Sequence, residues 1–236
     1  MRSFLFILFA LVPIFCYSET IFLRNNLSRT EKGDYLVSVR NKNYTLILIE
    51  KKLADSLVIQ EVTIPQQLFP RQCKTWRSWL EAGAPSHTAW VAYTVDLKTG
   101  KLQNYYSYIH QSYMNISETD NILSKLINLP LHPLPEYKRR HVGTSDGRSR
   151  LWHPRMVVDG NSVPGVMFDA WEGRWPPDQS QLSGSTIHIY LPQKGKGYPD
   201  YFPYWLQVKA TVGKAKLRIV DSGHQLTSPH QHPLNR

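Results

Sequence analysis

Alternating apolar and polar residues recur along the chain and predict β-strands. Residues 34–40 alternate in this way, and a short turn leads into a second apolar run, residues 44–49. Residues 56–64 form a third run, which ends at Pro65 because proline cannot donate a ladder hydrogen bond. This order predicts a hairpin followed by a third strand.

Two segments carry apolar residues at helical spacing instead. In the first, Pro70 suits the first turn, Gly83 suits the end, and one face holds Cys73, Trp76, Trp79 and Leu80. In the second, Ser117 and Asp120 give a capping-box pattern before an apolar stripe made of Ile122, Leu123, Leu126 and Ile127. We therefore expect two short helices in the N-terminal half, the second stopped by Pro130.

The remaining apolar runs read as strands. Residues 88–97 and 102–109 flank a turn in which Gly100 is free to take a positive φ, as a hairpin requires. Five further runs follow at 152–158, 166–171, 185–191, 204–212 and 214–220. No helix separates them at the spacing of a parallel βαβ unit. The pattern predicts a mainly β, β-rich α+β protein with antiparallel sheets and one or two short helices in its N-terminal half.

A change of composition divides the chain. Residues 130–150 combine prolines, glycines and a run of Lys and Arg, which is typical of an exposed basic loop or linker. It separates a β-rich half with two helices, residues 19–129, from an antiparallel β half, residues 151–226. We expect the two halves to pack as one domain and residues 227–236 to form a disordered tail.

The N-terminus reads as a secretory signal peptide, residues 1–18. Arg2 precedes an apolar run of twelve residues, and a short polar exit ends at Ser18, after which we expect cleavage. Such a run is well short of the roughly 20 residues that span a bilayer. Lipidation at Cys16 and an uncleaved anchor are the alternatives, although bulky Phe15 before the cysteine is unfavourable for lipidation.

Cleavage would leave an exported protein, periplasmic or secreted, with Cys73 as its single cysteine and therefore no internal disulfide. It would also leave no transmembrane segment. The chain has a net charge of +10, and +9 without residues 1–18, which favours anionic partners. Export argues against nucleic acid, so we expect no nucleic-acid partner. The oligomeric state is open.

Aromatic residues gather in the second half. Eight rings fall within residues 171–205, interleaved with prolines, and flat rings stack on sugars or lie at membrane surfaces. The same residues equally suit a core. As ligand-binding candidates we name Trp171, Trp175, Tyr201, Tyr204 and Trp205.

Catalytic chemistry has weaker support. Ser145 lies in a G-x-S-x-G string, with Asp178 and His224 downstream, but basic residues flank it where a hydrolase has a strand and a helix. A carboxylate pair drawn from Asp169, Glu172 and Asp178 would suit glycoside hydrolysis only at the right spacing. We therefore name no catalytic residue.

Metal and thiol chemistry have little support too. His230 and His232 give two imidazoles without a third ligand beside them, and Cys73 on an apolar helix face is typical of a core residue. We expect no metal and no cofactor. The sequence favours an exported, non-enzymatic binding or structural protein whose partner is a lipid, a glycan or an envelope protein. A secreted hydrolase using Ser145 or a carboxylate pair is the alternative.

Overall fold

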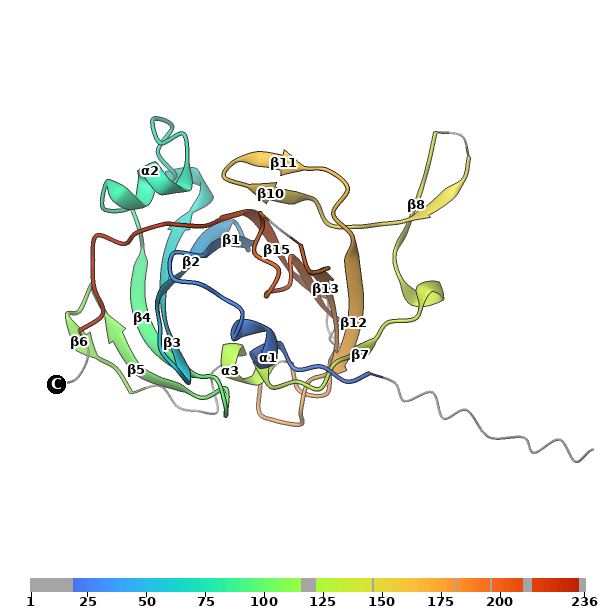
Figure 1. The fold of residues 1–236 in the computed structure, drawn as a ribbon, viewed down its shortest axis with the longest axis horizontal. Coiled ribbons are helices and arrows are strands. Elements are labelled where there is room, and N and C mark those ends of the chain that lie inside the picture. The colour runs from blue at the N-terminus through green and yellow to red at the C-terminus, as the bar shows by residue number, and fades with distance from the viewer. Residues whose placement is uncertain are drawn as a thin grey trace, which may run out of the picture.

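The protein is built around one strongly curved antiparallel sheet. The structure, a computed structural model, describes residues 19–115, 122–145, 147–180, 182–195, 197–209 and 214–233. Eleven strands follow one another in the order β6-β5-β4-β3-β2-β1-β15-β14-β13-β12-β7. The sheet bends into a U, and helices α1 and α3 lie inside its curve (Figure 1).

The helices are α1 (Leu23–Leu27), α2 (Trp76–Glu81) and α3 (Ile122–Ile127), with 3-10 turns at η1 (Gln66–Leu68) and η3 (Glu136–Lys138). The first strands of the large sheet are β1 (Tyr35–Arg40), β2 (Asn43–Lys52), β3 (Ser56–Pro65), β4 (Ala89–Asp96), β5 (Leu102–Ser107), β6 (Ser112–Tyr113) and β7 (His132–Pro133). The last are β12 (Phe168–Arg174), β13 (Thr186–Pro192), β14 (Trp205–Lys209) and β15 (Lys214–Gly223). Two small hairpins form separate two-stranded sheets: β8 (His141–Gly143) with β9 (Ser149–Leu151), and β10 (Met156–Val158) with β11 (Asn161–Val163).

The predicted fold class is confirmed. Strand accounts for 43% and helix for 11% of the described residues, and the pairings of the large sheet are antiparallel. The hairpin of β1 and β2 pairs Tyr35 with Leu48 and Val37 with Leu46. The turn between β4 and β5 places Gly100 at φ +69°, as its role in the predicted hairpin requires.

The helices depart from the sequence expectation in extent and number. The segment between Pro70 and Gly83 is helical only as α2, because Thr75 caps it: its hydroxyl accepts from the Ser78 backbone N–H at 3.1 Å. Helix α1 was not expected, since five residues carry too little periodicity to detect. Helix α3 matches the expected stripe, whereas Ser117 and Asp120 lie outside the described residues, as do residues 1–18 of the predicted signal peptide.

Both halves of the chain share the sheet, so they form one unit. The first strand β1 pairs with the last strand β15, with Tyr35 opposite Gly223. Residues 130–150 are less of a linker than expected: β7 adds to the edge of the sheet beside β12, and the β8–β9 hairpin follows.

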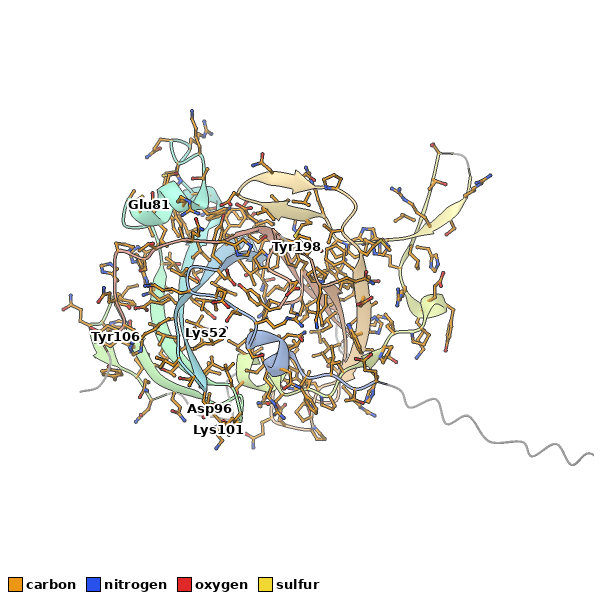
Figure 2. The ribbon with its side chains drawn as sticks, viewed as in Figure 1. Lys52, Glu81, Asp96, Lys101, Tyr106 and Tyr198 are labelled. Atoms are coloured by element: carbon orange, nitrogen blue, oxygen red, sulfur yellow. The ribbon has the colours of Figure 1, made fainter. Side chains whose placement is uncertain are left out.

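The curved sheet has a core on each face. The larger cluster lies mainly between the concave face and the helices α1 and α3, which contribute Leu23, Leu27, Leu126 and Ile127. The smaller cluster lies between the convex face and α2, which contributes Trp79 and Leu80. Side chains from the sheet and from the helices point into the curve of the sheet (Figure 2).

Residues 227–233, expected to be part of a disordered tail, instead lie along the convex face. The backbone N–H of His232 donates to Glu50 at 2.8 Å, and the His230 carbonyl accepts from Gln60 at 2.8 Å. Leu226, just before them, is 3% exposed. Local composition predicted disorder here. It contains no sign of the partners that order this segment, because they are more than 150 residues away in sequence.

Candidate functional site

An apolar cavity of about 490 Å³ opens on the concave face of the sheet. It lies between helix α3 and strands from both ends of the chain. Its apolar lining comes from Ile47, Leu102, Leu123, Leu126, Phe202 and Leu217. A volume of this size is within the range of small-molecule binding sites.

A smaller hollow of about 80 Å³ adjoins this cavity and shares four of its lining residues, Arg40, Ile122, Leu126 and Leu217. The hollow continues the apolar lining along β13 and β14 through Ile187, Leu206 and Val208, and reaches Trp175 just after β12. Two exposed cations line it as well, Arg40 and Lys216. Together the two spaces form an apolar site, here called the concave cavity, with positive charge at its rim.

Strand alternation explains why this side of the sheet is apolar. On β2 and β3 the odd-numbered residues Ile47, Ile49, Leu57 and Ile59 face the helices, while the even-numbered ones face α2. Helix α3 turns its stripe toward them, with Leu126 at 7% exposure. The cavity remains because α1 and α3 are only five and six residues long and do not cover the whole curve.

Polar groups also line the cavity, namely Ser38, Arg40 and Thr45 as well as Glu61 with Tyr93 and Tyr105. Glu61 follows Leu57 and Ile59 on the inward face of β3, and its carboxylate accepts a hydrogen bond from the Tyr93 hydroxyl. The Tyr93 ring stacks on Tyr105 at 5.8 Å between centroids. Burial raises the pKa of Glu61 above its ordinary value, and the hydrogen bond from Tyr93 opposes this shift. Burial and the nearby Glu61 raise the pKa of Tyr105 to about 12. Both shifts favour the neutral forms of Glu61 and Tyr105, which form hydrogen bonds without carrying a charge.

Glu61→Gln is expected to stabilise the protein at about pH 7. The folded state raises the pKa of Glu61, so the unfolded chain ionises more readily and wild-type stability falls as pH rises above the ordinary value of 4.5. Glutamine cannot ionise and keeps the shape of the side chain. Urea unfolding across pH should show a gain for the variant at neutral pH that closes below pH 4.5. A gain that persists unchanged in acid would contradict this assignment.

The five aromatic candidates are core residues, at most 9% exposed: Trp171, Trp175, Tyr201, Tyr204 and Trp205. They do not form one surface. Trp175 lines the smaller hollow of the concave cavity. Trp205 instead packs against Trp152 and Tyr190, with ring centroids 5.3 Å apart in each pair. Tyr204 donates to the Ser222 hydroxyl at 2.7 Å. Direct contact of these rings with a ligand stays a prediction, and Trp175 alone among them borders the concave cavity.

The residues considered for hydrolysis have separate partners. Ser145 is exposed in the turn between β8 and β9. Asp178 accepts from Lys125 at 2.5 Å and from the Trp175 indole at 3.0 Å, and His224 lies 2.7 Å from Asp34. Among the residues that the structure describes, Asp178 and His224 are therefore bonded to other groups and not to Ser145.

The carboxylates do not pair either. Asp169 and Glu172 are three positions apart on β12 and therefore point to opposite faces of the sheet. Asp169 accepts from Gln193 at 2.9 Å, whereas Glu172 lies 3.2 Å from Lys138 and 3.4 Å from His188. Asp178 belongs to the loop after the strand.

The late histidines bind within the protein. His230 stacks on Tyr108 at 5.2 Å, and His232 lies 2.9 Å from the Asn104 carbonyl. No group of three His, Cys, Asp or Glu suited to a metal occurs among the described residues. Cys73 is half-buried against the convex core beside Trp76.

Apart from Trp175, sequence reasoning did not identify the residues of the concave cavity. Its signal was a charged residue, Glu61, at an inward position of an otherwise apolar strand, and a charged residue that ends an apolar strand, Arg40. Neither is distinctive without the three-dimensional arrangement of β1, β3 and β15.

Comparison with known proteins agrees with this fold. The 2.0 Å structure of the hypothetical protein CT021 from Chlamydia trachomatis is similar, with a TM-score of 0.65 and 19% sequence identity, over 92% of this chain and 99% of that chain. At this identity the likeness shows the fold alone. No curated protein matches the chain. The profile of the family described as CT021 protein matches residues 45–164, slightly more than half of the chain. The chain therefore belongs to the CT021 protein family.

Proposed function

We propose that the protein is an exported, non-enzymatic binding protein for an anionic amphiphile with one acyl chain. The observation that carries this proposal is the concave cavity, whose walls are mostly aliphatic and whose rim holds Arg40 and Lys216. Such a lining favours a molecule with an apolar body and a negative end.

The apolar body would lie between α3 and the sheet. Leu126 and Leu217 line both the cavity and its smaller extension, so a chain threaded past them would contact apolar atoms along its length. Burial of apolar surface stabilises such a complex by about 25 cal/mol per Å². A volume near 490 Å³ is modest for a binding site, which favours one acyl chain over two.

The anionic end would lie at the rim. Arg40 ends strand β1 and Lys216 lies on β15; both are exposed and line the smaller hollow. An arginine can hold a carboxylate or phosphate through two parallel hydrogen bonds. Glu61 and the two tyrosines inside the cavity would accept or donate further hydrogen bonds to polar atoms of the ligand.

Export belongs to the same proposal. It is supported by the order of charged, apolar and small residues over 1–18 and by the basic remainder of the chain. Across the residues that the structure covers, no helix has the length and apolar character needed to cross a membrane. A periplasmic or secreted carrier of a lipid would fit these features, and the separation of Ser145, Asp178 and His224 favours binding over hydrolysis.

Leu217→Trp is expected to weaken the binding of a fluorescent fatty acid at least tenfold. The added ring would occupy the space shared by the cavity and the hollow, where a chain would otherwise lie. Binding is measured by titration of a dansyl-labelled undecanoic acid. Leu68→Trp is the matched control, since Leu68 is 47% exposed and lies outside the cavity. Equal affinity of both variants for the probe would overturn the proposal.

The headgroup is tested separately. Arg40→Gln should weaken binding of the anionic probe about two- to fivefold, because an exposed ion pair contributes about 0.5–1 kcal/mol. It should leave the affinity for the corresponding neutral alcohol unchanged. Equal losses for both probes would refute a negative headgroup at Arg40 while leaving the apolar chain in place.

A further inference from the structure

The β8–β9 hairpin is a basic arm that projects from the body of the protein (Figure 1). Each of its strands is three residues long, and most of its side chains are exposed. The turn is closed by backbone hydrogen bonds, with the Thr144 N–H donating to the Arg148 carbonyl at 2.7 Å. Within the described residues, the hairpin pairs with no strand of the large sheet.

The charge of this arm is strongly one-sided. Residues 137–155 contain six Lys or Arg and one acidic residue, a net charge of +5 in a chain whose total is +10. Arg140, Arg148 and Arg150 are exposed, and so is Lys138, whose ammonium lies 3.2 Å from Glu172 on β12. His153, at the base, has a lowered pKa because of burial and then the positive charge of Arg139 and Arg150.

The base of the arm is fixed to the core, so its charges are held in place. The Trp152 N–H donates to the Arg140 carbonyl at 2.8 Å, and the Arg140 guanidinium lies 4.8 Å from the Trp152 ring centroid. Trp152 in turn packs against Tyr190 and Trp205. Tyr137, in the turn η3 that precedes the β8–β9 hairpin, is 80% exposed, the most exposed of the large hydrophobic side chains described.

We propose that this arm docks the protein onto the surface of an anionic lipid bilayer. Clustered Lys and Arg are attracted to anionic headgroups, and exposed tyrosine is favourable at the membrane–water interface. The export proposed above favours a bilayer over nucleic acid as the anionic surface. This docking is independent of the concave cavity, so it stands if the cavity proves to bind nothing.

The test compares vesicle binding of two triple variants of the full chain that remove the same charge. Lys138→Gln/Arg148→Gln/Arg150→Gln removes three positive charges from the arm segment, and Lys51→Gln/Arg71→Gln/Lys74→Gln removes three from exposed residues elsewhere. Flotation uses vesicles of equal parts phosphatidylcholine and phosphatidylglycerol, with pure phosphatidylcholine as the neutral surface. Each cation near the surface contributes about fivefold to partitioning, so the arm variant should lose roughly a hundredfold. The control variant should lose less than about fivefold.

Two further measurements, at high salt and with a substitution of the exposed tyrosine, sharpen this test. Raising ionic strength from about 0.1 to about 1 M should release the wild type, because the screening length falls from about 10 to about 3 Å. Tyr137→Ser should weaken binding to the anionic vesicles without changing net charge. Equal losses for the two triple variants, or tighter binding to RNA than to the vesicles at the same ionic strength, would overturn the proposal.

Discussion

A chain that ends at Gly223 is expected to lose about 4 kcal/mol of unfolding free energy. The deletion removes Leu226, which is 3% exposed in the convex core, and a buried leucine contributes about 2–3 kcal/mol. It also removes two of the hydrogen-bond partners of a buried glutamine, Gln60, which adds about 1–2 kcal/mol.

Gln60 shows why this segment matters to stability. Its side chain is fully buried on the convex face. The side-chain oxygen of Gln60 accepts hydrogen bonds from the Trp90 indole N–H at 3.0 Å and from the Ser228 hydroxyl at 2.7 Å. Its amide donates to Glu50 at 2.7 Å and to the His230 carbonyl at 2.8 Å. The C-terminal segment supplies two of these partners, so its removal takes two hydrogen bonds from a fully buried side chain, which keeps those to Trp90 and Glu50.

Urea unfolding followed by tryptophan fluorescence measures this loss. Leu226→Ala alone should account for about half of it. Gln60→Ala should be clearly destabilising in the full chain and much milder in the chain ending at Gly223, because part of its network is already gone. An unchanged midpoint for the shortened chain would restore the expectation of a disordered tail.

Trp175→Ala is expected to cost about 4 kcal/mol. Trp175 is 1% exposed and packs in the larger core cluster below α3. Its indole donates to Asp178, and the same carboxylate oxygen lies 2.5 Å from the Lys125 ammonium on α3. The substitution therefore opens a large cavity and weakens the group that holds this helix against the sheet.

Trp175→Phe separates the two effects. It keeps most of the apolar volume, so it should cost about 1–2 kcal/mol. Thermal unfolding followed by circular dichroism gives both values. If Trp175→Ala left stability unchanged while weakening amphiphile binding, the ring would be a ligand contact and its assignment to the core would be wrong.

Sequence patterns predicted the strands well and the helices less well. Alternation over 34–40, 44–49 and 56–64 is a local property, and it recovered β1, β2 and β3 nearly to their ends. Helix α1 escaped prediction because its stability comes from burying Leu23 and Leu27 against distant strands. The order of the strands in the sheet was equally out of reach, since β1 meets β15 only in three dimensions.

The candidate site was harder to predict for the same reason. Aromatic residues were conspicuous in sequence, yet large rings that serve a core and rings that serve a surface look alike until burial is known. The concave cavity draws single residues from many strands, such as Ile47, Tyr105 and Leu217. No stretch of sequence brings these together, and each one alone is an ordinary strand residue.

The neighbouring positions of β1 and β15 govern when the fold can be completed. Their partners lie nearly the whole described chain apart, so the sheet acquires its central ladder only after the last strand is available. Closing so long a loop costs entropy before any contact repays it, and sheets rich in such distant pairings fold slowly. A nascent chain of this protein would therefore complete its sheet only when synthesis is almost finished, although the local pairs of β2 to β5 are available earlier.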